Sequence, residues 1–412
     1  MSETFRPARE EEIPEIARVM GHSFVGRTQE QLETLLREGP YSGVEALWVG
    51  EEEGRVVAAC DLHSMQQWIG GARYPMMGLG SVAVSPVHRR RGLAGRLVTS
   101  GLRVARERGD LVSALYPFRI AFYARLGYGL AGEAHQYQLP PETVPDAPER
   151  RRLRSVSSEE DRATLRRVYD RWAQGENGQL ERGDGVWRRM WEDEARAGVV
   201  YWGEAGEAEG YAVVRYRADL PPQERFLEVE ERAWLTPAAQ RGIYGWLASL
   251  GDQWHSLLYR AHPEEGFANH LSEERLPLGR EPHWGLWFPA ATLMRGPMFR
   301  LLNVSGAFAA RRVAAEAALD LALEVEDEQL PENRGPWRLR LEGKRCEVEA
   351  GSAGAGEATL RLQVTTLSRI FIGDLAPSAA VATGRATLDR PELLPALDSA
   401  LRLRRPWTFD RF

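Results

Sequence analysis

The segment from Ser81 to Gly95 constrains the fold of this chain more than any other part of the sequence. It begins as a strand that ends at Val84, continues as a turn with three successive arginines, and opens a helix with apolar residues on one face. The first backbone N–H groups of a helix lack partners within it and lie at the positive end of its dipole. This order of elements predicts an α/β layer with an anion-binding site at the junction.

The residues of this turn are suited to a pyrophosphate. Gly92 and Ala94 are small enough to let phosphate oxygens approach the backbone, and the arginines add positive charge. The predicted binding residues of the turn are Arg89, Arg90, Arg91, Gly92, Leu93, Ala94 and Gly95. The alternative is a basic turn that only caps a surface helix, and the order of the surrounding elements favours the binding site.

The first third of the chain alternates between strands and helices. Strands are predicted at residues 5–8, 47–51, 56–62, 79–84 and 111–116, and helices at 12–23, 29–38, 92–108 and 122–126. A stretch with four prolines among acidic residues, 140–152, predicts a linker. Together these features predict one α/β unit with a mixed sheet.

A second unit repeats this order and suggests a duplication. Strands are predicted at residues 153–156, 199–203, 211–216, 226–235 and 257–261, and helices at 159–173, 186–197 and 237–250. Its strand-to-helix junction, 235–244, has lost the run of arginines and places Tyr244 where a phosphate would need close access to the backbone. We therefore predict that only the first unit binds the anionic ligand.

From about residue 288 the pattern changes to alternation with period two. The apolar positions Leu319, Leu321 and Leu323, and later Leu360, Leu362 and Val364, predict strands with one buried face. The third unit is therefore predicted to be an α+β domain with a one-sided antiparallel sheet. The predicted domains are 1–142, 150–287 and 288–412.

Composition argues against several classes of protein. A formal charge of −6 argues against a nucleic-acid surface. The sequence contains no run of 18 or more apolar residues, so no membrane helix is predicted. The first residues resemble neither a secretory signal nor a transit peptide, so the cytoplasm is the expected location. Cys60 and Cys346 lie far apart and the histidines show no paired spacing, so we expect neither a disulfide framework nor a metal site.

The spacing Arg-x-x-Gly-x-Ala, formed by Arg89, Gly92 and Ala94, resembles the acetyl-CoA motif of the GNAT superfamily of N-acetyltransferases. The strand before the motif and the helix after it match the family's element order. The resemblance implies that acetyl-CoA is the acetyl donor. It also implies that the pantetheine arm lies along the end of the preceding strand, at Val82, Ala83 and Val84.

The segment Phe122 to Gly129, with the sequence FYARLGYG, resembles a signature of the Eis (enhanced intracellular survival) family. Two acetyltransferase-like units and an α+β domain that ends on an aromatic residue match that family over nearly the whole chain. The resemblance implies a degenerate second unit, a third domain similar to sterol carrier proteins, and hexamers. It also implies a second CoA-contacting segment at Phe118 and Arg119.

Acetyl transfer to an amine needs a base for the amine and a proton for the departing thiolate. Tyrosine suits the second task, because its reference pKa of about 10 keeps it protonated at neutral pH. The Eis resemblance assigns the general acid to Tyr123 and the general base to the α-carboxylate of Phe412. The alternative for Tyr123 is a core aromatic residue. The aromatic residues in the tail 406–412 favour its docking against the protein.

The acceptor is expected to be an amine on a small molecule, a polyamine or a lysine. Family members that acetylate aminoglycosides have acidic residues where this sequence has Gly26 and Arg411, so capture of polycations should be weaker. Asp410, with Glu30 and Glu33, could compensate. Two other readings are a lipid or sterol carrier with vestigial acetyltransferase units and an acetyl-CoA-binding regulator; the intact turn favours an enzyme over the carrier.

Overall fold

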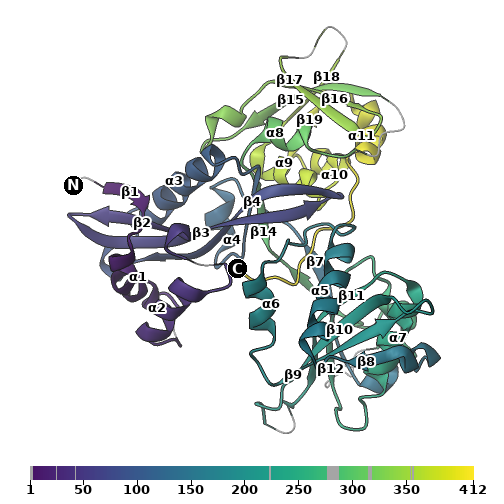
Figure 1. Cartoon of the computed structure of the whole chain (residues 1–412). Coiled ribbons are helices and arrows are strands. Elements are labelled where there is room, and N and C mark those ends of the chain that lie inside the picture. The colour runs from purple at the N-terminus through teal and green to yellow at the C-terminus, as the bar shows by residue number, and fades with distance from the viewer. Residues whose placement is uncertain are drawn as a thin grey trace.

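Three β-sheets with covering helices follow one another along the 412-residue chain (Figure 1). The computed structural model describes residues 3–24, 26–41, 43–221, 224–275, 287–313, 318–352, 354 and 357–412. The arrangement confirms the predicted fold class, which is two α/β units followed by an α+β domain.

The first sheet has the strand order β1-β2-β3-β4-β5-β14-β6. Its strands are β1 (Glu3–Pro7), β2 (Leu47–Glu52), β3 (Arg55–Ile69), β4 (Ala72–Val84), β5 (Val112–Leu115), β14 (Met298–Leu301) and β6 (Gly129–Leu130). Its helices are α1 (Ile13–Gly21), α2 (Gln29–Glu38), α3 (Leu93–Glu107) and α4 (Ile120–Ala124). Helices α1 and α2 bury one face of the sheet and α3 buries the other, because successive strand residues point to opposite faces.

The second sheet has the order β13-β7-β12-β11-β10-β9-β8. Its strands are β13 (Thr292–Arg295), β7 (Glu133–Leu139), β12 (Leu257–Ala261), β11 (Leu227–Trp234), β10 (Ala208–Tyr216), β9 (Arg196–Trp202) and β8 (Leu153–Ser155). Helices α5 (Glu159–Ala173) and α7 (Pro237–Ala248) pack on opposite faces, and α6 (Asp184–Met190) follows α5. The predicted helix 186–197 is too long, because Asp193 forms a turn with Ala195 and Arg196 that opens β9.

Each of the first two sheets contains one strand from the other unit. Strand β7 follows β6 in the chain but pairs with β12 and β13 in the second sheet. Strand β14 follows β13 but pairs with β5 and β6 in the first sheet. The three sheets therefore do not coincide with the predicted domain ranges. The range 1–142 includes β7 of the second sheet, and 288–412 includes β13 of the second sheet and β14 of the first. Pairing between distant segments leaves no local pattern that would reveal this exchange.

The third sheet has the order β17-β16-β15-β18-β19. Its elements are β15 (Leu319–Glu326), β16 (Trp337–Glu342), β17 (Arg345–Ala350), β18 (Ala358–Gln363), β19 (Ala386–Leu388), α8 (Val304–Ala309), α9 (Val364–Phe371), α10 (Pro377–Ala382) and α11 (Leu394–Ala400). The sheet is mixed rather than antiparallel, because β18 returns parallel to β15 after the β16–β17 hairpin. Val364, predicted in a strand, begins α9 instead.

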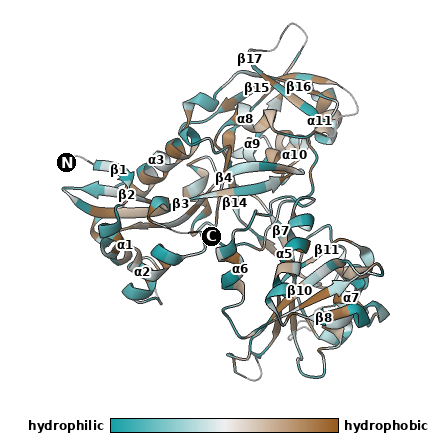
Figure 2. Cartoon of the chain, viewed as in Figure 1, coloured by the Kyte–Doolittle hydropathy of each residue, from teal (hydrophilic) through white to brown (hydrophobic). Residues whose placement is uncertain are grey.

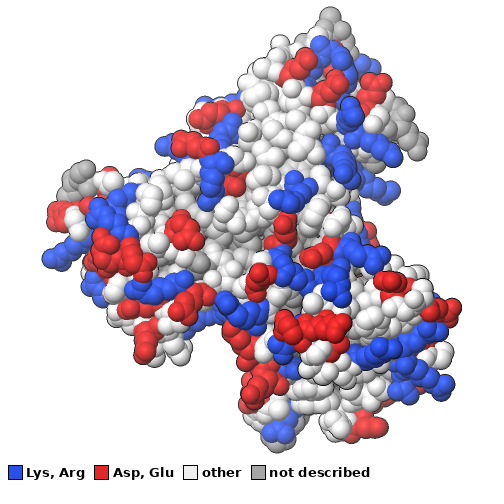
Figure 3. Space-filling view, viewed as in Figure 1, with Lys and Arg blue, Asp and Glu red and all other residues white. Residues whose placement is uncertain are grey.

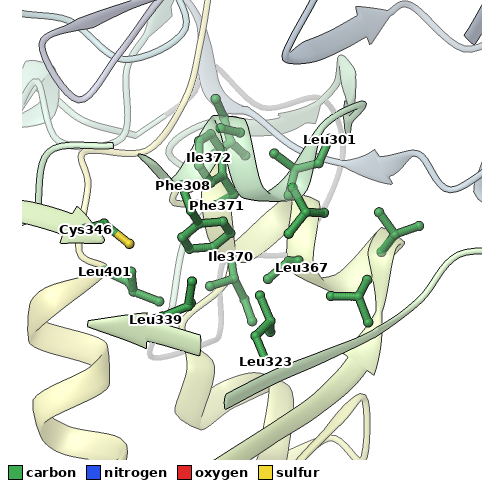
Figure 4. Close-up of a cluster of buried hydrophobic side chains, with 14 of the residues drawn as sticks. Leu301, Phe308, Leu323, Leu339, Cys346, Leu367, Ile370, Phe371, Ile372 and Leu401 are labelled. Atoms are coloured by element: carbon green, nitrogen blue, oxygen red, sulfur yellow. The ribbon is translucent and has the colours of Figure 1, made fainter. Parts of the chain in front are cut away.

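The core of the third domain continues into the first unit. Figure 4 shows Phe371 of α9 beside Phe308 in a cluster of buried side chains that also contains Leu323. The same cluster includes Tyr74 and Met76 of β4. The long β3–β4 hairpin therefore packs against the third domain at one end and carries the basic turn at the other.

The surface of the described residues mixes both signs of charge. On the face shown in Figure 3, arginines and carboxylates are interspersed. Figure 2 shows helices with both apolar and polar segments, as expected where amphipathic elements cover a sheet. None of the helices in the described part of the chain is long and apolar enough to cross a bilayer, and no three metal-ligating side chains gather there.

The strand exchange predicts how fragments of this protein behave. A fragment of residues 1–142 lacks β14, so β5 and β6 lose the strand between them. Joining Gly132 directly to Gly296 should restore it, because a Cβ atom on Gly132 would lie 2.3 Å from the Gly296 carbonyl oxygen. We expect cooperative thermal unfolding, followed by circular dichroism, for residues 1–132 joined to 296–309 and not for 1–142. Equal cooperativity of the two fragments would contradict this account.

Candidate active site

Strands β4 and β5 run side by side only over a short stretch. Residues 76–78 of β4 pair in parallel with residues 112–114 of β5. Beyond this point β4 continues to Val84, and among the described strands none pairs with that edge. The predicted contact residues Val82, Ala83 and Val84 lie along it. The edge of β4 beyond Gly78 therefore has no partner strand among the described residues and can hydrogen-bond an extended arm that carries amides; the space beside this edge is called the cleft below.

A β-bulge interrupts β4 beside this cleft. Ala59 of β3 faces Ala83 and Asp61 faces Gly80, so Ser81 and Val82 together oppose a single residue, Cys60. Ser81 has a φ of 49°, which is unusual for a residue with a side chain. Bulges redirect backbone groups and occur next to active sites. Nothing in the sequence around Ser81 indicates the bulge.

Helix α3 begins at the end of the cleft with free backbone donors. Gly92 precedes the helix with a φ of 77°, and no side chain caps the helix. The backbone N–H groups of Leu93, Ala94 and Gly95 have no acceptor in the described part of the chain, and the first helical bond runs from Arg96 N to Gly92 O at 3.2 Å. Three free N–H groups at the positive end of a 15-residue helix are suited to bind a phosphate as a ligand.

The three arginines of the turn have different environments. Arg91 donates two hydrogen bonds to the Glu52 carboxylate, at 2.6 and 3.1 Å. Arg89 donates to the carbonyl oxygen of Val84 at 3.0 Å and to that of His22 at 3.2 Å. The side chain of Arg90 is exposed and has no hydrogen bond or ion pair with any described residue. Arg89 and Arg91 therefore hold the turn in place, and Arg90 is the guanidinium left for a ligand.

The equivalent junction of the second unit has lost two of these three free donors. Thr236 caps α7 by accepting a hydrogen bond from Ala239 N at 3.2 Å, and Pro237 has no N–H group. Tyr244 does not lie at the helix start, contrary to the prediction, because α7 begins at Pro237 and places Tyr244 two turns further along, where it is buried and donates to Glu265 at 2.8 Å. The cap and the proline at the helix start agree with the expected loss of binding in the second unit.

Tyr123 of α4 lies beside the cleft in the apolar cluster that α3 covers. Its ring is 5.5 Å from that of Phe118 and 6.0 Å from that of Tyr128. Its hydroxyl has no hydrogen-bond partner among the described residues. Burial raises the pKa of Tyr123, with smaller contributions from Tyr128 and Cys60. The phenol is therefore a protonated donor at neutral pH. Phe118 and Arg119, in the loop before α4, are exposed.

Phe412 brings the end of the chain to the apex of the cleft, which is the point near Gly78 where the pairing of β4 with β5 ends. A Cβ atom on Gly78 would lie 2.8 Å from its ring, so the ring packs directly on the last residue of β4 that pairs with β5. The rings of Tyr116 and Tyr41 lie 5.5 and 6.4 Å away. Met77 and Leu79 face the cluster that contains Tyr123. Phe412 and Tyr123 therefore approach β4 from opposite faces.

Two buried titratable residues that the sequence analysis missed lie close to this apex. His63 and Asp61 of β3 are 3% and 4% exposed, and a Cβ atom on Gly80 would lie 3.2 Å from His63 Nε2. His63 Nδ1 donates to the carbonyl oxygen of Tyr41 at 2.7 Å, since a carbonyl oxygen can only accept. Asp61 Oδ1 has no partner in the described residues. The pairing of β3 with β4 brings these two residues close to the apex, and this pairing could not be seen in the sequence.

Asp410 does not supply free negative charge to the cleft, contrary to expectation. It is 5% exposed and accepts a hydrogen bond from Arg182 Nε at 2.7 Å. Burial raises the pKa of its carboxyl group, and Arg182 opposes this effect. The charge of Asp410 is thus committed to an internal ion pair. Glu30 is exposed on α2, and Glu33 accepts a hydrogen bond from Gln29 at 3.0 Å.

Relatives of this chain share its length and its fold. An uncharacterized N-acetyltransferase of Streptomyces avermitilis is 26% identical over 99% of this chain and 98% of its own. N-acetyltransferase Eis of Mycobacterium tuberculosis is 27% identical over 79% of this chain and 78% of its own. The crystal structure of a GCN5-related N-acetyltransferase from Anabaena variabilis, 21% identical, matches the fold with a TM-score of 0.85 over the whole of both chains.

Family models match three successive parts of the chain. Two different models of a GNAT acetyltransferase domain match residues 4–131 and 178–301, and a model of a sterol carrier protein domain matches residues 304–409. The three matches agree with the three sheets and with the relatives that span most of the chain. The protein is therefore an Eis-like acetyltransferase of the GNAT superfamily, with two acetyltransferase domains and a sterol carrier domain.

Proposed function

We propose that the first unit transfers the acetyl group of acetyl-CoA to a primary amine by direct attack. The observation that carries this proposal is the cleft between β4 and β5, which ends at the uncapped start of α3. A cleft with free strand groups and an anion site at one end matches an elongated ligand with amides and a pyrophosphate. The measurement that tests it is release of free thiol from acetyl-CoA over a panel of amines.

The pantetheine arm is proposed to hydrogen-bond the open edge of β4 at Val82, Ala83 and Val84. The pyrophosphate then accepts from the backbone N–H groups of residues 93–95, with Arg90 as an added positive charge. Phe118 is proposed to contact the coenzyme from the side of the cleft opposite β4. Its exposure supports this contact, because 71% of its surface is exposed although it is a large apolar residue.

Tyr123 is proposed as the general acid. In the reaction the amine nitrogen bonds to the acetyl carbon, the C–S bond breaks, and the departing thiolate takes the phenol proton. Its raised pKa and its unpartnered hydroxyl support this role, because the proton is present at neutral pH and no other group holds it. Solvent then returns a proton to the phenolate.

The α-carboxylate of Phe412 is proposed as the general base that accepts the proton of the attacking amine. No described residue gives this carboxylate a hydrogen bond or an ion pair. Its ring is fixed at the apex of the cleft by Tyr41 and Tyr116. The base and the acid then lie on opposite faces of β4, with the thioester between them beside the bulge at Ser81.

The acceptor is proposed to be an amine on a small molecule, a polyamine or a lysine side chain. Aromatic rings at the apex suit an ammonium group that also carries apolar surface. Because Asp410 is paired, aminoglycosides are not favoured over less charged amines. The family resemblance suggests a cytoplasmic hexamer, and the exposed Leu293 and Met294 on the edge strand β13 support an interface there. A monomer in light scattering would overturn the hexamer.

We expect one acetyl-CoA site per chain, and Gly92→Ala should weaken it about tenfold. A side chain at a φ of 77° costs roughly 1–2 kcal/mol, and relief of that strain would distort the anion site. Titration calorimetry measures both quantities. Gly54→Ala is the matched control, since Gly54 has a φ of 75° with open space around it and lies outside the cleft. Two sites per chain, or equal effects of both variants, would contradict the assignment.

Tyr123→Phe should lower kcat about a hundredfold. The pKa of Tyr123 is raised, so the acid form is kept as pH rises, and ionisation of this phenol should not reduce wild-type activity below its usual pKa of about 10. A pH profile of kcat tests this. The control is Tyr137→Phe, which changes a buried tyrosine of the second sheet. Tyr123→Phe with wild-type kcat would exclude the phenol as the acid.

Deletion of Phe412, or addition of one residue after it, should lower kcat about a hundredfold. Both changes move the carboxylate away from the apex, whereas the binding surface on β4 and α3 is unchanged. The dissociation constant of acetyl-CoA, measured by calorimetry, should therefore stay within about twofold. Undiminished turnover in both variants would remove the carboxylate from the mechanism.

A further inference from the structure

The C-terminal tail docks on the second unit before it reaches the first. In Figure 1 the yellow tail leaves the third domain, passes the second unit and ends close to α6 and the first unit. Trp407 N donates to the carbonyl oxygen of Asn177 at 3.0 Å, and Gln179 Nε2 donates to that of Trp407 at 3.2 Å. The Asn177 side chain also donates to the carbonyl oxygen of Arg404 at 2.6 Å.

The segment that receives the tail is itself fixed to the first unit. Gly178 N donates to the carbonyl oxygen of Trp68 and Trp68 N donates to that of Gln179, both at 2.8 Å. Glu181 N donates to the carbonyl oxygen of Gln66 at 2.9 Å. Residues 178–181 therefore run along the end of β3, and the next residue, Arg182, has a set position relative to the first unit's cleft.

Arg182 joins this segment to the tail through a buried ion network. Its side chain is 2% exposed and donates two hydrogen bonds to Glu231 of β11, both at 2.8 Å. Its Nε donates to Asp410 Oδ1 at 2.7 Å. The guanidinium also lies 4.0 Å from the centre of the Tyr169 ring. Glu231 therefore orients the guanidinium group of Arg182, and Arg182 fixes the carboxylate of Asp410 by an ion pair.

Asp410 and Phe412 share two tyrosine partners. Tyr41 donates its hydroxyl to Asp410 Oδ1 at 3.3 Å, and its ring packs against Phe412. Tyr116 donates its hydroxyl to the carbonyl oxygen of Asp410, and its ring also packs against Phe412. Only Arg411 lies between them, and two residues of extended chain span at most about 7 Å. A fixed Asp410 therefore leaves the terminal carboxylate little freedom.

We infer that Arg182, oriented by Glu231, acts through Asp410 as the positioning residue for the terminal carboxylate. The second acetyltransferase unit, whose own anion site is closed, thus serves as the receptor that aims the catalytic tail of the first. This inference rests on the proposed function of Phe412 as general base. It gives the closed unit a part in the reaction that requires no ligand of its own.

Asp410→Asn and Glu231→Gln test the inference in the full-length protein. Asp410→Asn removes the charge that Arg182 holds, and Glu231→Gln weakens the orientation of Arg182 without touching the tail. Each should lower kcat at least about tenfold, with the KM for acetyl-CoA within about twofold, because a displaced catalytic group costs rate rather than coenzyme affinity. Glu230→Gln is the matched control, since Glu230 neighbours Glu231 and pairs with Arg196 instead. It should leave kcat unchanged.

A double-mutant cycle separates positioning from general stability. In protein that lacks Phe412, Asp410→Asn should cause no further loss of kcat, because no base remains to be aimed. An equal loss with and without Phe412 would overturn the inference, as would wild-type kcat in Asp410→Asn. If deletion of Phe412 alone leaves kcat unchanged, both the proposed base and its positioning are wrong.

A second measurement does not depend on the acceptor amine. A carboxypeptidase that prefers aromatic C-termini should release Phe412 at least about tenfold faster from Asp410→Asn and Glu231→Gln than from wild type or Glu230→Gln, followed by mass spectrometry. If the wild-type protein acetylates no amine, the proposed function fails, and faster release still supports the anchor. Equal release rates in folded variants would overturn the anchor itself.

Discussion

The reciprocal exchange of β7 and β14 is the constraint on which the rest of the structure depends. Each strand supplies main-chain hydrogen bonds to two strands of the other unit. These bonds cannot be given up singly without leaving buried polar groups unpaired. On β14, the buried Arg300 also pairs with Asp327 at 2.8 and 2.9 Å, which ties the third domain to the same strand. The exchange therefore sets the relative positions of all three parts.

These fixed positions allow the candidate active site to be built from distant segments. The candidate anion site and the cleft come from β4 and α3, the proposed acid from α4, and the proposed base from the last residue of the chain. The rings of Tyr116 and Phe118 connect them, because one packs on Phe412 and the other on Tyr123. The loop 116–119, between β5 and α4, thus contacts both the proposed base and the proposed acid.

The two acetyltransferase units have the same strand order but differ at the strand-to-helix junction. An uncapped helix with Gly92 before it leaves N–H groups for a ligand, whereas Thr236 and Pro237 satisfy or remove them. The second unit has instead buried charges, of which Arg182 and Glu231 are the clearest. An ion pair buried this deeply contributes little net stability, because its desolvation offsets its attraction. The fixed geometry of this ion pair matters more than its net stability, and it suits the proposed positioning of the C-terminal tail.

Local sequence determined the elements and the candidate anion site, and tertiary structure decided how they combine. Helices Gln29–Glu38 and Glu159–Ala173 were predicted with the bounds that the structure has, because Thr28 and Ser158 form capping boxes within one turn. The turn at Gly92 was likewise readable, since a helix start and its free donors are set by adjacent residues. The strand exchange, the bulge at Ser81, the pairing of Asp410 and the place of His63 were not readable. They depend on contacts between residues far apart in the chain, whose energies appear only when the sheets have formed.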